Sequence, residues 1–89
     1  MFGERVRELR EEQGLFLRQM AAHLEVDTAY VSKIETGGRN ANKEQVLGII
    51  DFLKAEKSEL LTLWLADKIQ EVIQGEDYVN EALELVKKK

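Results

Sequence analysis

The chain has 89 residues, of which 44% are hydrophobic and 34% are charged. This length fits one domain near the lower limit for a self-sufficient hydrophobic core, and the composition excludes a disordered chain. The sequence contains no cysteine, which excludes disulfides and thiolate metal sites. It also contains no signal-peptide core and no long uncharged apolar stretch, so we expect a cytoplasmic protein with no membrane partner.

The net charge of −4 is unevenly distributed. Residues 1–43 hold seven basic and seven acidic side chains, whereas residues 44–89 hold six basic and ten acidic ones. From Thr28 to Lys43 the only acidic residue is Glu35, against three basic residues. Because nucleic-acid binding depends on local positive charge, an acidic chain with such a basic segment is compatible with a nucleic-acid partner.

Hydrophobic spacing and capping residues predict an all-α chain of five or six helices. Asp27 and Ser58 are expected to cap helix starts, and Gly14, Gly37 and Gly75 to end helices. The expected helices cover about residues 3–13, 17–24, 28–36, 43–54, 58–74 and, from 76 or 77, up to 86. The absence of proline is consistent with such a chain.

The stretch from Met20 to Gly37 has the pattern of two short helices joined by a turn of three or four residues. Ala21 is small where the two helices would approach most closely, and Val26 would fill the turn. Val31 and Ile34 would anchor the second helix while its opposite face stays polar. A helix presented in this way fits the major groove of B-DNA, about 12 Å wide. The pattern therefore predicts a helix-turn-helix unit that binds double-stranded DNA.

The most specific part of this stretch is the run Val31-Ser32-Lys33-Ile34-Glu35, followed by Gly37 and Arg39. With this run and six further residues, the sequence over residues 5–61 resembles the Cro and phage-repressor family of helix-turn-helix proteins, also called XRE-like regulators. The six further residues are Arg10, Gly14, Leu15, Ala21, Leu24 and Val26. The resemblance implies a lambda-repressor-like fold and sequence-specific DNA binding.

Two places depart from the family pattern. Many relatives open the second helix with Ser or Thr and then a Gln that contacts a phosphate, but Phe16 and Leu17 stand here, and Arg18 is the candidate replacement. Glu25 stands in the turn where Gly is common, which predicts mild strain in a left-handed conformation.

In the resembling family, the first turns and outer face of the third helix contact base edges. The corresponding residues here are Thr28, Ala29, Tyr30 and Lys33. The alternative is a solvated helix face with Tyr30 as a half-buried aromatic. DNA-backbone contacts are expected from the loop into the fourth helix and the first turn of that helix, at Arg39, Asn40, Asn42 and Lys43. Three residues elsewhere are further candidates for such contacts, namely Arg10, Arg18 and Ser32. The alternatives are an ordinary polar loop and a Ser32 that is simply small.

The resemblance also implies a pair between Arg10 of the first helix and Glu35 of the third, with Arg10 facing a phosphate as well. The alternative is two exposed charges that never meet. His23, the only histidine, is expected on the surface. The sequence shows no metal-ligand cluster, no nucleophile beside a base and no phosphate-binding glycine loop, so we expect no catalytic residue, metal or cofactor, and no enzyme.

Apolar residues of the predicted fifth helix cover more than half of its circumference, which exceeds one core-facing stripe. This surplus favours one face on the core and another on a second chain, with Leu60, Trp64 and Leu65 as interface residues. A twofold homodimer would place two recognition helices about 34 Å apart, one turn of DNA. The alternative is a monomer in which the sixth helix folds back over the fifth.

These observations predict a single compact domain, with a DNA-binding region at 1–57 and C-terminal helices at 58–89 that complete the core and dimerise. The expected function is that of a dimeric transcriptional regulator with a palindromic operator. Such one-domain regulators resemble the controller proteins of restriction-modification systems, small phage repressors and antitoxins. The controller is favoured because no ligand-binding domain follows the DNA-binding part. The alternative function is a protein-interaction module such as an antitoxin, in which residues 58–86 bind a partner protein.

Overall fold

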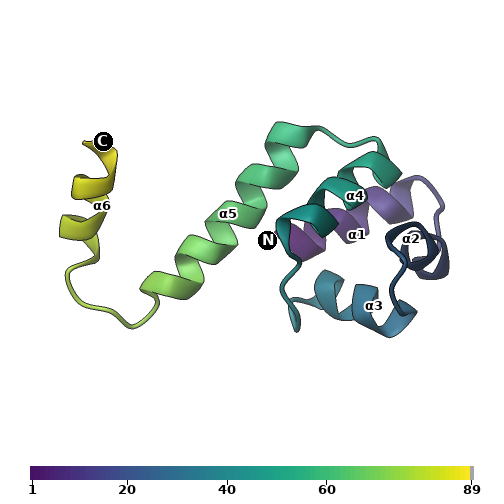
Figure 1. The fold of residues 1–89 in the computed structure, drawn as a ribbon, viewed down its shortest axis with the longest axis horizontal. Helices are drawn as coiled ribbons and strands as arrows, with labels where there is room; N and C mark the ends of the chain where they lie inside the picture. The colour runs from purple at the N-terminus through teal and green to yellow at the C-terminus, as the bar shows by residue number, and fades with distance from the viewer. Residues whose placement is uncertain (89) are drawn as a thin grey trace.

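The computed structural model describes residues 1–88, and these residues form six α-helices with no strand among them. Lys89, the last residue of the expected C-terminal region, lies outside the described residues. The all-α prediction is confirmed. In chain order the helices are α1 (Phe2–Glu12), α2 (Leu17–Leu24), α3 (Thr28–Thr36), α4 (Lys43–Leu53), α5 (Lys57–Ile73) and α6 (Val79–Lys87) (Figure 1).

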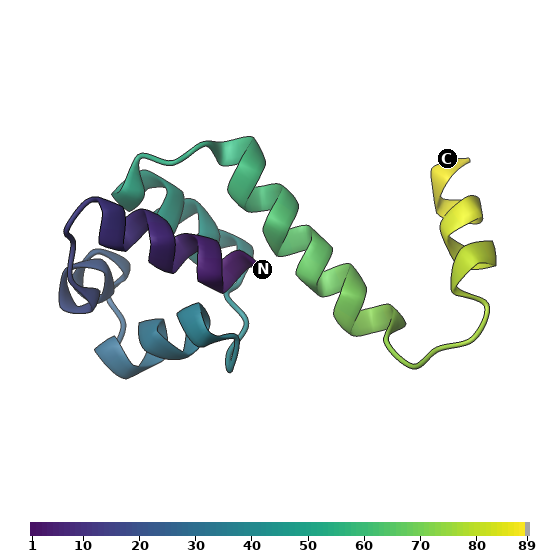
Figure 2. The same cartoon turned by 180° about the vertical axis from the view of Figure 1, so that it is seen from behind.

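The hydrophobic core is formed by α1–α4 and the first half of α5. Each of these five helices contributes at least one large side chain that is almost completely buried, because each has an apolar stripe at helical spacing. These residues are Val6, Met20, Val31, Val46, Ile49, Leu53 and Leu60. Figures 1 and 2 show α1–α4 gathered in one bundle, with α5 beginning beside it and running away from it.

Two predictions about the start of α5 are wrong. Leu60, expected at a dimer interface, is 0% exposed within the protomer, because this part of α5 packs against α1 and α4. Ser58, expected as the capping residue, lies inside the helix. The helix begins one residue earlier with Glu56 as its N-cap, and the Ser58 hydroxyl donates a hydrogen bond to Glu56 Oε1 at 3.1 Å.

The first turn of α1 touches the end of α3 backbone to backbone. Gly3 is buried there, and a Cβ on it would lie 2.6 Å from the carbonyl oxygen of Glu35 and closer still to that of Ile34. Only a residue without a Cβ allows this approach. The C-terminal end of α3 is therefore fixed against α1.

The second half of α5 and all of α6 extend away from the bundle, which gives the protein extents of 43 × 23 × 21 Å (Figures 1 and 2). No residue of α6 is buried, and the helix does not fold back along α5. It begins at Val79, later than predicted, because Gly75 and Tyr78 both have a left-handed backbone and keep the connection open. The expected compact domain therefore includes the first half of α5 but not α6.

Among residues 1–88, no helix is both long enough and apolar enough to cross a membrane.

Candidate nucleic-acid interface

The connection between α2 and α3 is a short turn held by hydrogen bonds to the end of α2. Glu25 has φ 57° and ψ 45°, the left-handed conformation that the sequence predicts. Its N–H donates to the Ala22 carbonyl at 3.2 Å, and the N–H of Val26 donates to the Ala21 carbonyl at 3.0 Å. Ala21 is only 3% exposed, which is consistent with the close packing of α2 on α3. These bonds fix the direction in which α3 leaves the turn.

Replacing Glu25 by glycine is expected to raise the free energy of unfolding by about 1 kcal/mol, because glycine adopts the left-handed conformation without a Cβ clash. Equilibrium unfolding in urea measures this change. As a control, Glu25→Ala removes the carboxylate but keeps the Cβ, and it is expected to stay within about 0.5 kcal/mol of the wild type. Equal stabilisation by both variants would contradict the backbone explanation.

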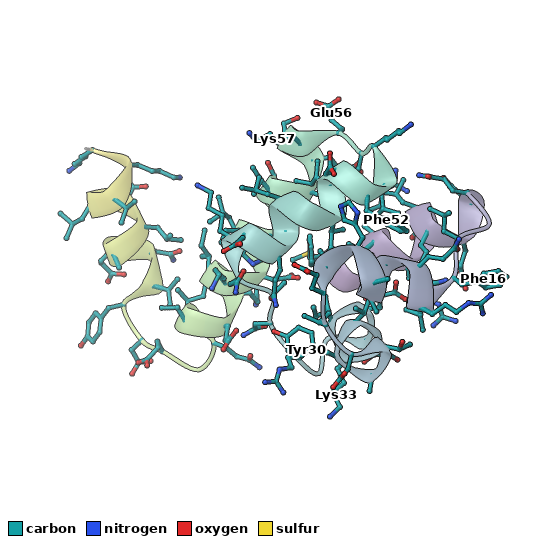
Figure 3. All side chains as sticks on the ribbon, turned by 45° about the vertical axis from the view of Figure 1, so that its right-hand side comes forward. Phe16, Tyr30, Lys33, Phe52, Glu56 and Lys57 are labelled. Carbon is teal, nitrogen blue, oxygen red and sulfur yellow. The ribbon has the colours of Figure 1, made fainter. Side chains whose placement is uncertain are left out.

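Helix α3 has one buried face and one exposed face. Val31 and Ile34 are almost fully buried in the core. Three of the four predicted base contacts, Thr28, Ala29 and Lys33, are exposed. Figure 3 shows Lys33 projecting outward at the edge of the molecule. Asp27 occupies the N-cap position as predicted, although its side chain makes no capping hydrogen bond.

Tyr30, the fourth predicted base contact, is half-buried at the junction of α3 and α4. Its ring packs against the core, and its hydroxyl donates to Gln45 Oε1 at 3.2 Å. The guanidinium carbon of Arg39 lies 4.7 Å from the centroid of the ring. Tyr30 therefore has a structural role between the two helices, which leaves only part of its ring at the surface.

Arg10 and Glu35 form a buried bidentate ion pair, the pair that the family resemblance implies. Arg10 Nε donates to Glu35 Oε2 at 2.7 Å, and Nη2 donates to Oε1 at 3.1 Å. Nη1 donates to the carbonyl oxygen of Leu15 at 2.8 Å. The hydrogen bond with Glu35 is the main cause that raises the pKa of Arg10 above its ordinary value. The Arg10 side chain is only 10% exposed, so it ties α1 to α3 and offers little surface to a phosphate.

Four further predicted DNA-backbone contacts lie in the loop between α3 and α4 and at the first residue of α4. They are Arg39, Asn40, Asn42 and Lys43, and all four are exposed. Asn42 is the N-cap of α4, and its Oδ1 accepts a hydrogen bond from the Gln45 N–H at 2.8 Å. Asn40 Nδ2 donates to Glu71 Oε2 on α5 at 3.1 Å. The two asparagines thus have partners within the protein, while Arg39 and Lys43 supply positive charge at the surface.

Three further residues, Arg18, Ser32 and His23, lie on α2 and α3. Arg18 lies at the start of α2, with its guanidinium carbon 4.5 Å from the centroid of the exposed Phe16 ring. Gln19 Oε1 accepts a hydrogen bond from the Phe16 N–H at 2.7 Å and so supplies part of the missing cap. Ser32 is half-buried on α3, and His23 is exposed with its Nε2 3.2 Å from Asp51 Oδ2.

Gln45, which the sequence did not single out, and Trp64, for which it predicts a different role, organise this surface. Gln45 accepts hydrogen bonds from Tyr30 and from the Asn42 N–H, and the spacing Asn42-x-x-Gln45 is a capping-box signal that could have found it. Trp64 Nε1 donates to the Ala41 carbonyl at 2.7 Å. No local signal reveals this bond, because its two ends are 23 residues apart.

Two short helices joined by a tight turn, with the second helix exposed on one face, define a helix-turn-helix domain. Residues 1–63, more than half of the chain, match the family model described as a helix-turn-helix domain. The chain belongs to this family. It is therefore a DNA-binding protein of the class that includes transcriptional regulators.

Two solved structures share the fold, and both are of the clp gene regulator ClgR from Corynebacterium glutamicum. The first has a TM-score of 0.64 and 24% sequence identity, and it covers 74% of this chain and 86% of that chain. The second has a TM-score of 0.65 and 22% identity, with coverage of 96% and 88%. At this identity the likeness establishes the fold alone. No curated protein sequence matches the chain.

Proposed function

We propose that the protein is a sequence-specific transcriptional regulator that binds a palindromic operator in duplex DNA as a homodimer. It acts in the cytoplasm and without catalysis. The observation that carries this proposal is the way α3 is presented. Val31, Ile34 and the Arg10–Glu35 pair hold one face of the helix in the protein, so that the opposite face is exposed on a rigid support. A helix supported in this way has the size and position to enter the major groove.

The exposed face of α3 offers three kinds of base contact. The Lys33 ammonium can donate a hydrogen bond to guanine O6 or N7, and the Thr28 hydroxyl can form a hydrogen bond with a base edge. The Ala29 methyl can pack against a thymine methyl. Arg39, Lys43 and the free N–H groups at the start of α4 bind the sugar-phosphate backbone. Arg18 and Ser32 are secondary candidates for phosphate contacts, and Tyr30 lies at the margin of the surface.

Lys33→Ala and Lys43→Ala are expected to weaken DNA binding in different ways. Loss of Lys33 removes a base contact, so it should cost about 1–3 kcal/mol at the operator and relax specificity at one base pair of each half-site. Loss of Lys43 removes a phosphate contact, so it should weaken binding to every sequence alike and reduce the salt slope by about 1 for each protomer bound. Fluorescence anisotropy with operator and mutated-operator duplexes measures both. Identical effects on all duplexes would contradict the role of Lys33.

Dimerisation is supported by two exposed apolar stripes. On α5, Leu65, Ile69 and Val72 follow helical spacing and are 50%, 49% and 74% exposed. On α6, a similar stripe is formed by Val79, Ala82, Leu83 and Val86, none of which is buried. Contiguous apolar surface of this kind marks an association site. In a twofold dimer a second copy brings the same two stripes, which makes the surface self-complementary.

Within this class we propose the controller of a restriction-modification system, ahead of a small phage repressor. The helix-turn-helix domain of residues 1–63 and the helical extension that follows it supply the two properties that this proposal requires, DNA binding and association. The neighbouring structures are described as gene regulators, and this description supports regulation as the purpose of DNA binding here.

A protein-interaction module such as an antitoxin is the second candidate function, because the same apolar stripes also fit a different protein. Sedimentation equilibrium of the isolated chain separates the two. A dimer at micromolar concentration supports the homodimeric regulator. A chain that remains monomeric leaves the stripes of α5 and α6 to another protein and supports the interaction module.

The decisive test of the function is selection of bound sites from random duplex DNA at several salt concentrations. We expect a palindromic consensus with half-site centres about 10 base pairs apart. We also expect affinity to fall steeply with salt, because phosphate contacts release counterions. Binding that is indifferent to sequence would contradict the proposal.

A further inference from the structure

A single peptide group, between Ala41 and Asn42, is fixed at both of its polar atoms. Its carbonyl oxygen accepts a hydrogen bond from Trp64 Nε1 at 2.7 Å, and its N–H donates to Gln45 Oε1 at 3.0 Å. The Ala41 side chain is 3% exposed, so its Cβ is also held. This peptide immediately precedes α4, and its orientation sets the direction of the first N–H groups of that helix.

The same peptide connects α5 to the recognition helix. Gln45 Oε1, which holds the Asn42 N–H, also accepts the Tyr30 hydroxyl at 3.2 Å, and Arg39 stacks on the Tyr30 ring. The chain of contacts therefore runs from Trp64 on α5, through the loop and α4, to α3. Every step is a direct hydrogen bond or ring contact.

In the part of the chain that the structure describes, two side-chain hydrogen bonds join the loop to α5, the Trp64 bond and a bond between Asn40 and Glu71. A cleft of about 270 Å³ lies between the first turn of α1, the loop and α5, and Asn40, Trp64 and Glu71 are among its lining residues. The Asn40–Glu71 hydrogen bond is exposed, so water competes for both partners and the bond contributes little. The Trp64 bond is partly buried and is the main tie between the loop and α5.

We propose that Trp64 is a positioning residue for DNA binding, which acts through its indole N–H on the loop between α3 and α4. The proposal rests on the proposed function, because it assumes that this loop and the start of α4 bind the DNA backbone. Trp64 itself does not touch DNA. It keeps Arg39, Lys43 and the N–H groups of α4 in the positions from which they reach phosphates. The sequence predicts Trp64 as a dimer-interface residue, whereas the role proposed for its indole N–H is to position the loop between α3 and α4.

The test compares Trp64→Phe with the wild type on a random-sequence duplex of about 24 base pairs, roughly two turns of B-DNA. Phenylalanine keeps an aromatic ring against the core but cannot donate the hydrogen bond. We expect a five- to tenfold lower affinity, because the coupling that one hydrogen bond transmits to DNA binding is limited to about its own free energy. We also expect the slope of log affinity against log salt to become shallower by about 1–2, because each lost phosphate contact contributes about 0.9.

A purely structural role would change stability but not the salt slope of the folded protein. Leu60→Val is the matched control, because it removes a methylene from the core side of the same helix and leaves the Trp64 indole N–H in place. Circular dichroism and sedimentation establish that all three proteins are folded and share one oligomeric state. A Trp64→Phe variant with the wild-type affinity and slope would overturn the proposal. A wild type that binds no duplex would instead overturn the proposed function and this inference with it.

A measurement on the wild type keeps the proposal testable if Trp64→Phe does not fold. Coupling between two events is reciprocal, so a bond that strengthens DNA binding must itself be strengthened by DNA. Exchange of the Trp64 indole N–H with solvent, followed by NMR, should therefore slow five- to tenfold when the duplex is added. Trp64 is the only tryptophan, so its signal is unambiguous. An exchange rate that DNA leaves unchanged would overturn the proposal.

Discussion

Arg10→Met is expected to lower the free energy of unfolding by about 3–5 kcal/mol, because it leaves the Glu35 carboxylate buried without its partner. The Leu15 carbonyl loses its donor as well. For a domain of this size the melting temperature should fall by at least roughly 12 °C. Thermal unfolding followed by circular dichroism measures the change.

Two variants show whether burial is the cause. Arg7→Met breaks an exposed ion pair with Glu11 on the same helix, and it is expected to cost less than about 0.5 kcal/mol. In the double variant Arg10→Met/Glu35→Leu no unpaired charge remains, and most of the lost stability should return. A similar loss for Arg7→Met and Arg10→Met would contradict the role of the buried pair.

If the protein is the homodimer proposed above, Ile69→Asp is expected to convert it into monomers and to weaken operator binding by about 10²–10⁴-fold. The substitution places a charge in the middle of the exposed apolar stripe of α5, so it disfavours association without disturbing the core. The affinity falls because two linked recognition helices bind with a high effective concentration that single protomers lack. Sedimentation equilibrium and operator titration measure the two effects.

Gln70→Asp is the matched control for this experiment, since it adds the same charge at the next position, outside the apolar stripe. It should leave the dimer and its operator affinity nearly unchanged. If Ile69→Asp remains dimeric, the interface lies elsewhere. If both variants dissociate, the added charge on α5 rather than its apolar stripe is responsible.

Local signals in the sequence were sufficient to predict most of the fold. The bounds of α2 and α3 follow from helical spacing between Gly14, Asp27 and Gly37, and the structure agrees with them. The left-handed turn at Glu25 could be predicted from the family resemblance, because Glu25 stands where the resembling proteins commonly have glycine. These features depend on residues a few positions apart, where backbone and capping preferences dominate.

Features that depend on tertiary packing could not be predicted in the same way. The apolar residues of α5 show that two faces are needed, but not which face meets the core, and Leu60 was assigned to the wrong one. The start of α6 depends on a left-handed Tyr78, a conformation that residue type does not favour. The roles of Tyr30 and Trp64 depend on hydrogen bonds between different helices, which periodicity does not reveal.

The close approach of Gly3 to the end of α3 has a consequence for the DNA. Since α1 meets the end of α3 backbone to backbone at Gly3, and the Arg10–Glu35 pair ties the same two helices, α3 has little room to tilt on its support. For the proposed homodimer, an operator whose half-sites are not ideally placed must then itself bend or change its twist to fit two rigid protomers. The energy of that deformation depends on the stiffness of the base pairs between the half-sites. We therefore expect selected operators to show a preference at central positions that no side chain reaches.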